Sequence, residues 1–500
     1  MADDTRDAPY EDAVPGASTS AGPAIGRDEW VARSGERRLA RGGPLGTVEK
    51  RVRAVPWWAW LVLFTAAFAL LPVAFESGYV RRVAFDTVLY MLLALGLNVV
   101  VGWGGLLDLG YVAFYGIGAY TYAFLSSDQF DIHWPTIVVV PLVVAVGAIT
   151  GLLVGLPSRR LSGDYLAIVT LFFLEIFLAV ATNGDDLFGL GNITGGANGI
   201  LRVDPLNFFG HHLPVQHEGV FAVSYLYVAL GFFFVVFVAL RFANHSRTGR
   251  AWRSLREDPL AAEMMGMPVN WLKLMSFAFG AAIAALTGTL FASLNASVFP
   301  LTFSFPLLIT IYTMVILGGI GSQAGVVLGA VLISVLLELL RNPGDARGLF
   351  YLSVLLGLVA AFRLSRRLAI VLAGTVAFGF VAHAVANAID GSWTSALTWD
   401  GREVPGWASE WVVTPAHLAA WVVPVSYISL VVCTLVLTLL RGWARLVFLV
   451  PVLYLAAFVW ENVMLAKPEP TRFIVLGALL VALMIVRPNG LLGERRVEIV

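Results

Sequence analysis

A stretch that is apolar enough to lie in a membrane opens on an acid and carries four tyrosines. It reads DLGYVAFYGIGAYTYAFL, residues 108–125. A polar side chain that faces hydrocarbon without a partner is costly, so these groups should face protein or water. On a helix, Tyr111, Tyr115 and Tyr122 share one face because their spacing follows the helical repeat. We expect this tyrosine face to point into a bundle of helices, where the phenols either line an internal path or bond to neighbouring helices.

Small residues in the same stretch indicate where a second helix can approach closely. We expect Ala113, Gly116 and Ala123 to form that surface.

Three acids, Asp108, Glu175 and Glu338, lie in or beside apolar stretches, where ionisable groups are functional hypotheses by default. Asp108 follows the tight turn GWGG at 102–105, which favours a capping role. Glu175 lies in the middle of an apolar segment, far in sequence from any cation. We therefore expect Glu175 to make an interior polar contact and to belong, with the tyrosine face, to a path through the bundle.

The composition places the chain among membrane proteins, since 58% of its 500 residues are hydrophobic and only 13% are charged. A helical span needs about 20 apolar residues, and such stretches recur from residue 57 onward. The expected fold class is an all-α, polytopic transmembrane helical bundle, preceded by a disordered cytoplasmic tail over 1–55. The 14 candidate spans are 57–75, 83–101, 106–125, 136–156, 165–182, 220–240, 272–294, 306–320, 324–340, 350–363, 368–388, 417–440, 444–464 and 472–486.

Arginine clusters set the orientation, because cytoplasmic loops carry an excess of basic residues. Strict alternation of the spans places nearly every cluster on one side, with both termini cytoplasmic. Arg81 and Arg82 fall on the opposite side, so the first two boundaries are the least secure. The segments 306–320 and 350–363 are short for a span, which is typical of tilted, broken or re-entrant helices. The clusters on the cytoplasmic side are Arg37, Arg38, Arg51, Arg53, Arg159, Arg160, Arg247, Arg250, Arg253, Arg256, Arg363, Arg366, Arg367, Arg441, Arg445, Arg487, Arg495 and Arg496.

The cytoplasmic loop 241–271 contains a predicted short helix. Asp258 followed by Pro259 is an N-cap pattern, and Gly266 suits a left-handed stop. About two turns are too short to be stable alone, so a partner would order them. One interpretation is a docking helix for a cytoplasmic partner, and the other is an interfacial helix held on anionic lipid by arginines spaced every three residues. The residues of the docking interpretation are Arg253, Arg256, Asp258, Leu260, Ala261, Ala262, Glu263, Met264 and Gly266.

Several other chemistries find little support in the sequence. A nucleotide-binding loop needs a lysine after glycines, and none of the three lysines, Lys50, Lys273 and Lys467, follows a glycine. The single cysteine, Cys433, excludes an intrachain disulfide and a cysteine metal cluster. We interpret the three histidines of the 183–219 loop, His211, His212 and His217, as part of a solvated loop rather than a metal site.

Several stretches together resemble the branched-chain amino acid ABC permease family, in particular its LivM-type subunit. The resemblance covers about residues 85–340 and the last thirty. Its motifs are LGLNVVVGWGGLLDLGYVAFYGIGAY (95–120), RLSGDYLAIVTLFFLEI (160–176), NITGGANGI (192–200), GRAWRSLREDPLAAEMMGM (249–267), AALTGTLFA (284–292), VILGGIGSQAGVVLGAVL (315–332) and RPNGLL (487–492).

The resemblance implies a permease subunit of an ABC importer in the bacterial inner membrane, rather than an enzyme. It would move branched-chain or related hydrophobic amino acids, and would need no cofactor of its own because ATP is used by partner subunits. The implied partners are a second, LivH-like permease, two cytoplasmic ATPases and an external solute-binding protein. Loop 241–271 would dock on the ATPases, although Leu260 stands where the family motif has a glutamate.

Two other functions stay open. The same family includes permeases for urea or short amides, and an ion-coupled secondary transporter would use Asp108 or Glu175 as its ion site. The chain also departs from the family pattern after Arg341. We expect a permease core over 56–341, inserted transmembrane segments over 342–471, and the last permease helix with a cytoplasmic C-terminus over 472–500.

Overall fold

The structure of the chain is a computed structural model that describes most residues after the N-terminal tail. The chain forms two compact units, Met1–Ala66 and Ala67–Val500, and all contacts given below lie within the second unit. The predicted disordered tail, 1–55, lies outside the described residues, as do Arg487, Arg495 and Arg496. The described ranges are 56–75, 77–161, 163–185, 192–208, 211–217, 220–221, 223–363, 365–395, 406–415, 418–465, 468–486 and 490–493.

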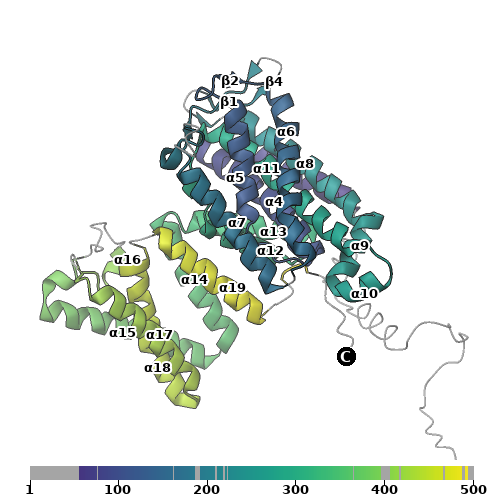
Figure 1. Ribbon diagram of the computed structural model, residues 1–500. Coiled ribbons are helices and arrows are strands. Elements are labelled where there is room, and N and C mark those ends of the chain that lie inside the picture. The colour runs from purple at the N-terminus through teal and green to yellow at the C-terminus, as the bar shows by residue number, and fades with distance from the viewer. Residues whose placement is uncertain are drawn as a thin grey trace, which may run out of the picture. The chain divides into compact units, whose positions relative to one another are not determined.

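Helices make up most of the described residues (Figure 1). Those before the predicted insertion are α3 (Trp57–Ala74), α4 (Gly78–Leu97), α5 (Tyr111–Leu125), α6 (Thr136–Gly155), α7 (Asp164–Thr182), α8 (Val223–His245), α9 (Arg247–Glu257), α10 (Pro259–Met264), α11 (Val269–Asn295), α12 (Phe305–Gly318) and α13 (Gln323–Leu339). Those that follow are α14 (Pro343–Phe362), α15 (Arg366–Ile389), α16 (Gly406–Ser409), α17 (Val422–Leu439), α18 (Gly442–Val459) and α19 (Pro468–Val486). Two π-helical segments, η1 (Asn98–Trp103) and η7 (Trp460–Met464), continue α4 and α18, and 3₁₀ turns form at η2 (Leu156–Arg159), η4 (Gly196–Asn198), η5 (Pro300–Phe303) and η6 (Gly391–Trp393).

The all-α, polytopic membrane fold is confirmed. Each of the 14 predicted spans coincides with a helix, and among the described residues 11 helical stretches are long and apolar enough to cross a membrane. The number of crossings and the side of each terminus stay predictions. The segment predicted at 350–363 is not short, because α14 runs without a break over Pro343–Phe362. The segment predicted at 306–320 does begin irregularly, since the 3₁₀ turn η5 precedes α12.

Helix α11 lies at the centre of the core, where small residues allow close approach. Gly147 and Gly151 of α6, four residues apart, face it. A methyl group on Gly147 would lie 2.5 Å from Cβ of Ala285, and one on Gly151 would lie 2.6 Å from Cβ of Ala281. Such small-residue faces let helices pack by van der Waals contact in a membrane, where the hydrophobic effect between helices is absent.

Short antiparallel strand pairs gather at one end of the core, called the strand end below (Figure 1). His133 at this end shares a hydrogen bond of 2.6 Å with Asp204, which joins β2 to the loop before β4, and this bond raises the pKa of the imidazole. The predicted loop histidines lie in β5 and β6, where the structure does not describe their side chains. The strand pairs are β1 (Ser126–Ser127) with β2 (Ile132–His133), β3 (Ile200–Leu201) with β8 (Ser297–Val298), β4 (Asn207–Phe208) with β5 (His211–His212), and β6 (Gln216–His217) with β7 (Val220–Phe221).

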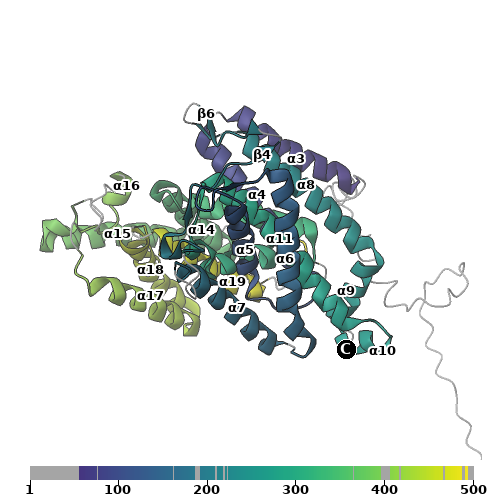
Figure 2. The same cartoon turned by 45° about the horizontal axis from the view of Figure 1, so that its top comes forward.

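The opposite end of the core, called the α10 end, carries α9 and α10 (Figure 2). The turn between α12 and α13 lies at this end too, since Gly321 is close to Arg256 of α9. Lys273 at the start of α11 donates a hydrogen bond of 3.3 Å to the carbonyl of Ser158, which joins η2 to this end. The amides of Leu491 and Leu492 donate to the carbonyls of Leu317 and Gly318 at 2.8 and 3.0 Å. The segment after α19 therefore contacts α12, although the insertion separates the two in sequence.

A buried ion pair joins the beginning of the predicted insertion to its end. Arg347 of α14 donates from Nε and Nη2 to the carboxylate of Glu461 in η7, at 2.8 to 2.9 Å. Glu461 is fully buried, Arg347 is 8% exposed, and Tyr351 donates a further hydrogen bond to Glu461 at 3.2 Å. Beside this pair, Trp460 stacks on Phe350 with 4.5 Å between ring centroids. This pair of residues, 114 positions apart in sequence, therefore joins the first and last of the inserted helices.

We predict that Glu461→Ala destabilises the inserted helices by about 3–5 kcal/mol, because it leaves the Arg347 guanidinium buried without a counter-charge. Chemical unfolding followed by the fluorescence of Trp460 would measure the change. The double variant Arg347→Met with Glu461→Met is the control, since it removes both charges and should recover most of the loss. A single variant as stable as the wild type would contradict this account of the insertion.

Candidate functional site

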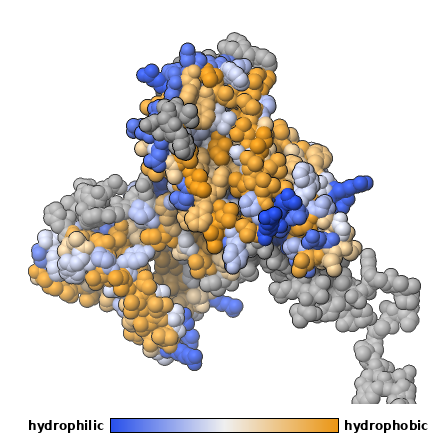
Figure 3. Space-filling model, in the orientation of Figure 1, coloured by the Kyte–Doolittle hydropathy of each residue, from blue (hydrophilic) through white to orange (hydrophobic). Residues whose placement is uncertain are grey.

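Helix α9 is fixed to the core by one apolar face. Ser246 caps its N-terminus, where the hydroxyl accepts a hydrogen bond of 3.3 Å from the amide of Gly249. Trp252 and Leu255 are buried, whereas Arg253 is exposed. Figure 3 shows polar residues gathered around α9 beside the broad apolar surface of the helices. This division of faces positions α10, which follows after a single residue.

The predicted start of the short helix is confirmed. One carboxylate oxygen of Asp258 accepts hydrogen bonds from the amides of Leu260 and Ala261, at 2.9 and 3.1 Å. Pro259 occupies the first helical position, where no amide hydrogen is required. These contacts satisfy donors that a helix N-terminus otherwise leaves open.

The predicted stop at Gly266 is confirmed as well. Gly266 has φ of +78°, a left-handed conformation that glycine adopts without strain. Its amide donates to the carbonyl of Glu263 at 2.9 Å, and the amide of Met267 donates to that of Ala262 at 3.1 Å. This pair of bonds is a Schellman motif, which ends the helix after two turns.

The capped helix presents three large apolar side chains, called the α10 knob. Leu260 is 75% exposed, Met264 is 89% exposed and Met265 is 81% exposed. Ala262, predicted to contact a partner, faces its own chain instead and is 3% exposed. Helical geometry explains this correction, because a two-turn helix that rests on α9 must turn one side inward. Ala261 and Glu263 lie on the outward side, where both are exposed.

The basic stripe predicted on α9 is only partly formed. Arg250 and Arg253 are exposed, but Arg256 is half-buried against two glycine-rich turns. Its Cα and Cγ come within 3.2 Å of where a methyl group on Gly105 would stand, and its Nη1 comes within 2.5 Å of one on Gly321. Residues spaced by three drift around a helix by about 60° per step, so the third arginine leaves the exposed face.

Two tryptophans join α9 to the core, in an arrangement called the tryptophan junction. The rings of Trp252 and Trp103 stack with centroids 6.0 Å apart and an interplanar angle of 24°. Trp252 Nε1 donates to the carbonyl of Leu272 at 2.9 Å, and Trp103 Nε1 donates to that of Gly321 at 3.0 Å. The amide of Gly321 in turn donates to Asn98 Oδ1 at 2.8 Å. The junction thus connects α9, the π-helical segment η1, the start of α11 and the α12–α13 turn.

Glycines make this junction possible. A side chain at Gly102 would collide with Asn98 Oδ1 and would lie 2.8 Å from the amide nitrogen of Gly321. Gly319 and Gly321 have φ of +113° and +92°, which disfavour any other residue. We did not predict the tryptophan junction from the sequence. The available signal was the pair of glycine clusters at 102–105 and 318–321, with Trp103 inside the first.

The tyrosine face does point into the bundle, as predicted. Tyr111, Tyr115 and Tyr122 are all buried. The ring of Tyr115 packs on Phe291 and Phe303 with centroids 5.6 and 5.1 Å apart. Tyr122 donates a hydrogen bond of 3.2 Å to the carbonyl of Asp204. The burial fits both interpretations of this face, so its place in a path stays a prediction.

The close approach to α5 differs from the prediction. Gly116 faces the rings of Phe177 and Phe303, so it does not meet a helix backbone. Contact with α11 occurs instead at Gly118, which lies against the backbone of Ala285, and at Gly288 of α11, where a methyl group would lie 2.5 Å from the amide nitrogen of Ala119. Gly118 shares the tyrosine face, so the bulky and the closely packed residues of α5 face the same helix.

Two of the three predicted intramembrane acids, Asp108 and Glu175, have different surroundings. Asp108 is fully buried, and its Oδ1 accepts a hydrogen bond of 2.9 Å from the amide of Gly110, the residue before α5. Within the described part of the chain, no side chain caps α5 itself, so the predicted capping role is wrong. The backbone of Asp108 also bonds the hydroxyl of Tyr312. Glu175 is exposed on α7, so the prediction of an interior contact within this chain is wrong. The rest of that α7 face is apolar, with Ile168, Phe172 and Ile176 exposed.

Comparison with known proteins identifies the family. A family model described as "Branched-chain amino acid transport system / permease component" matches residues 79–359, more than half of the chain. The chain belongs to this family. The match begins in α4, includes the tryptophan junction and the α10 knob, and ends within α14. It confirms the resemblance predicted from the motifs, and it continues past the boundary placed at Arg341, so that boundary stays a prediction.

Curated relatives include both kinds of permease found in these systems. A high-affinity branched-chain amino acid permease protein LivM of Salmonella typhimurium is 38% identical over 300 residues, which cover 56% of this chain and 68% of the relative. A probable LivM of Methanocaldococcus jannaschii is 30% identical over 287 residues, covering 53% and 76%. A LivH of Escherichia coli is 25% identical over 266 residues, covering 49% and 80%. No solved structure matches the chain.

We predict that Trp252→Ala destabilises the protein by about 3–5 kcal/mol, the usual cost of removing a buried aromatic side chain. The loss should also release α9 from η1, which limited proteolysis in the 246–268 loop would detect as faster cleavage. Trp271→Ala is the matched control, because Trp271 is 56% exposed on α11. Equal proteolysis of the two variants would show that the junction does not hold α9.

Proposed function

We propose that this chain is the transmembrane permease subunit of an ABC importer for branched-chain or related hydrophobic amino acids. It works in the cell membrane with a second, LivH-like permease, two cytoplasmic ATPases and an external solute-binding protein. The proposal is supported by family membership and by the names of the LivM and LivH relatives. The structural observation that carries it is the α10 knob, a capped helix whose apolar side chains are exposed at the α10 end.

The knob has the properties of a docking element. Large apolar side chains gathered on an exposed surface mark a contact site, and methionines adapt well to a groove. Two turns of helix are unstable in isolation, so the caps at Asp258 and Gly266 and the support of α9 keep this element formed before a partner arrives. Docking then needs little ordering of the chain. We assign the α10 end to the cytoplasm, where the ATPases would dock.

The tryptophan junction gives a route for mechanical coupling. When an ATPase moves α10, α9 moves with it, and the Trp252–Trp103 stack carries the displacement to η1. A π-helical segment is strained relative to an α-helix and is common at functional sites. Residues 104–110 connect η1 to α5, which carries the tyrosine face. ATP itself is bound and hydrolysed by the partner ATPases.

The α7 face fits a second permease. An ionised carboxylate near the middle of a membrane helix is expensive to expose to lipid. Glu175 is exposed on the isolated chain, so in the membrane it must meet protein or water. A second permease packed on this apolar face would bury Ile168, Phe172 and Ile176 and would provide a partner for Glu175.

The two alternatives predict different energetics and cargo. An ion-coupled transporter would concentrate solute without ATP, and a urea or short-amide permease would carry neutral molecules. Uptake by the complete complex in proteoliposomes, measured with ATP inside and without an ion gradient, separates all three. We expect accumulation of L-leucine, L-isoleucine or L-valine that stops without ATP. ATP-independent accumulation would overturn the proposal.

We predict that Leu260→Gln combined with Met264→Gln lowers ATP-driven uptake at least tenfold. Glutamine preserves helix propensity but removes the apolar contact with the ATPase. Basal ATP hydrolysis should persist while its stimulation by the loaded binding protein is lost. Leu156→Gln is the matched control, because Leu156 is exposed in η2 at the same end but outside the knob. Full uptake by the double variant would remove the docking assignment.

We also predict that Glu175→Leu weakens association with the second permease, whereas Glu175→Gln retains most of it through hydrogen bonding. A lipid-facing position would show the opposite trend, since leucine is favoured in hydrocarbon. The measurement is the yield of the second permease that co-purifies with this chain. Equal yields for both variants and the wild type would place the partner elsewhere.

A further inference from the structure

A cavity of about 320 Å³ lies between α4, α12, α13 and α19, near the ends of these helices that are remote from the α10 end. Its size falls at the lower end of the range for small-molecule sites. One part of the wall is apolar, formed by Val83, Pro306, Leu307, Leu337 and Phe473. The other part is polar, with Asp86, Thr87, Tyr90, Thr302, Ser304, Thr310, Ser334, Glu338 and Arg472.

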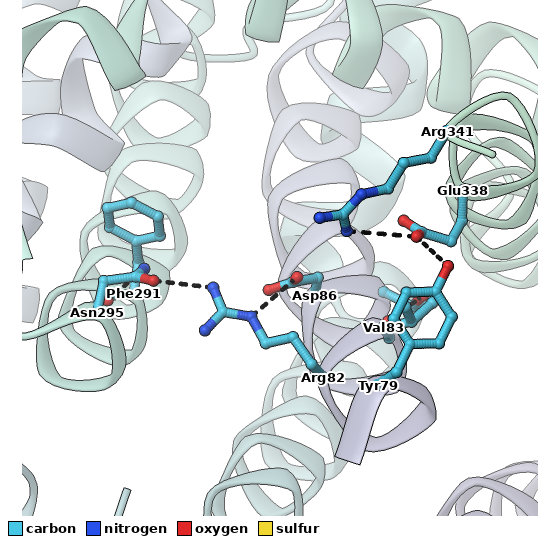
Figure 4. Close-up of polar contacts among 9 residues, drawn as sticks. Tyr79, Arg82, Val83, Asp86, Phe291, Asn295, Glu338 and Arg341 are labelled. Carbon is cyan, nitrogen blue, oxygen red and sulfur yellow. Dashed lines mark hydrogen bonds and ion pairs between the residues drawn. The ribbon is translucent and has the colours of Figure 1, made fainter. Parts of the chain in front are cut away.

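Two carboxylates in the polar wall are held in place by neighbouring groups (Figure 4). Oδ2 of Asp86 pairs with Nε of Arg82 at 3.1 Å, and Arg82 also binds Asn295 Oδ1 at 2.8 Å. Oε1 of Glu338 accepts from Tyr79 and pairs with Arg341 at 3.4 Å. Among the described residues, no hydrogen bond uses the second oxygen of either carboxylate.

These contacts also account for Arg82, one of the two arginines that the positive-inside pattern placed on the minority side. The charge of Arg82 is balanced by Asp86, so Arg82 has a structural role in this cluster. The ion pairs orient the carboxylates of Asp86 and Glu338, and each carboxylate keeps one oxygen that can accept a further hydrogen bond. A positively charged ligand group can then bind to oxygens that are already positioned.

Across the same cavity, two donors lack partners. Nε of Arg472 in α19 is buried, and no hydrogen bond within the described part of the chain satisfies it. The hydroxyl of Ser334, whose residue is 6% exposed, is likewise without a hydrogen-bond partner there. Buried polar atoms that remain unsatisfied are rare and each indicates a missing partner. A guanidinium and a hydroxyl together suit a carboxylate.

We propose that this cavity binds the zwitterionic α-amino acid during transport. The α-ammonium group lies toward Asp86 and Glu338, and the α-carboxylate lies toward Arg472 and Ser334. The aliphatic side chain packs against the apolar wall. This inference rests on the proposed function and deepens it by naming the group of the substrate that is recognised inside the membrane subunit.

The charge arrangement also decides among substrates of the family. Urea and short amides carry neither an ammonium nor a carboxylate, so they would form no ion pair with the free carboxylate oxygens or with the Arg472 guanidinium. A zwitterion pairs with both at once. With the α10 end in the cytoplasm, the cavity lies toward the external side, where the binding protein would deliver its cargo.

Direct binding to the purified permease–ATPase complex, without the solute-binding protein, tests the site. The probes are L-leucine, leucinamide, which lacks the carboxylate, and 4-methylpentanoate, which lacks the ammonium. We expect the wild type to bind L-leucine at least tenfold more tightly than either analogue, because a hydrogen-bonded charge pair is worth about 1.5–3 kcal/mol. Weaker binding of L-leucine than of both analogues would overturn the proposal.

Charge-specific variants sharpen the test. Arg472→Gln should abolish the preference for L-leucine over leucinamide only, and Asp86→Asn with Glu338→Gln should abolish the preference over 4-methylpentanoate only. Asp345→Asn is the matched control, since Asp345 is an exposed acid of α14 outside the cavity. Size-exclusion profiles verify that each variant is folded. If the cavity variants show the same ligand preferences as the Asp345→Asn control, the proposed site is wrong.

Uptake by the same variants separates this proposal from the broader one. If the wild type accumulates branched-chain amino acids and the cavity variants match the control, the site is wrong and the function stands. If L-leucine binds with the expected variant pattern but no amino acid is accumulated with ATP, the function fails and the site stands.

Discussion

Every polar group between the two ends of the bundle must find its partner inside the protein, because hydrocarbon offers none. This constraint explains the irregular elements of the core. The side chains of Asn98 and Trp103 in the π-helical segment η1 bond the backbone amide and carbonyl of Gly321 in the turn between α12 and α13. The same constraint explains why the buried Asp108 accepts a hydrogen bond from the amide of Gly110 and why Arg347 and Glu461 occur as a pair.

The constraint also connects the surface to the interior. The α10 knob exposes apolar side chains at a polar end of the molecule, whereas Glu175 exposes a charge on an apolar helix face. Each is unfavourable for an isolated chain, and in the proposed assembly a different partner covers each surface, an ATPase in one case and a second permease in the other. The tryptophan junction connects α9, which precedes the knob, to η1 through stacked rings, and in the proposed mechanism motion at the knob reaches η1 by this route.

Within the membrane subunit, the polar groups form two classes. Tyr122 donates a hydrogen bond to the carbonyl of Asp204, and the ring of Tyr115 packs on Phe291, so both contribute to the packed interior of the core. Asp86, Glu338 and Arg472 keep free capacity around a cavity, which suits a ligand that comes and goes. A transporter needs both classes. Polar groups whose hydrogen bonds are made within the protein hold the helices in place, whereas groups with unused hydrogen-bonding capacity can bind a substrate.

The amino-acid sequence by itself determined the helices, their approximate bounds and the capped helix α10. These features depend on local apolar length and on capping residues a few positions apart, such as Asp258 and Gly266. Only the tertiary structure decided which side of a helix meets which neighbour. It placed Glu175 outward and Ala262 inward, paired Trp103 with Trp252 and Arg347 with Glu461, and gathered four helices around one cavity. Such contacts join residues far apart in the chain, and a membrane helix that is apolar all round gives no periodic signal of the face that it buries.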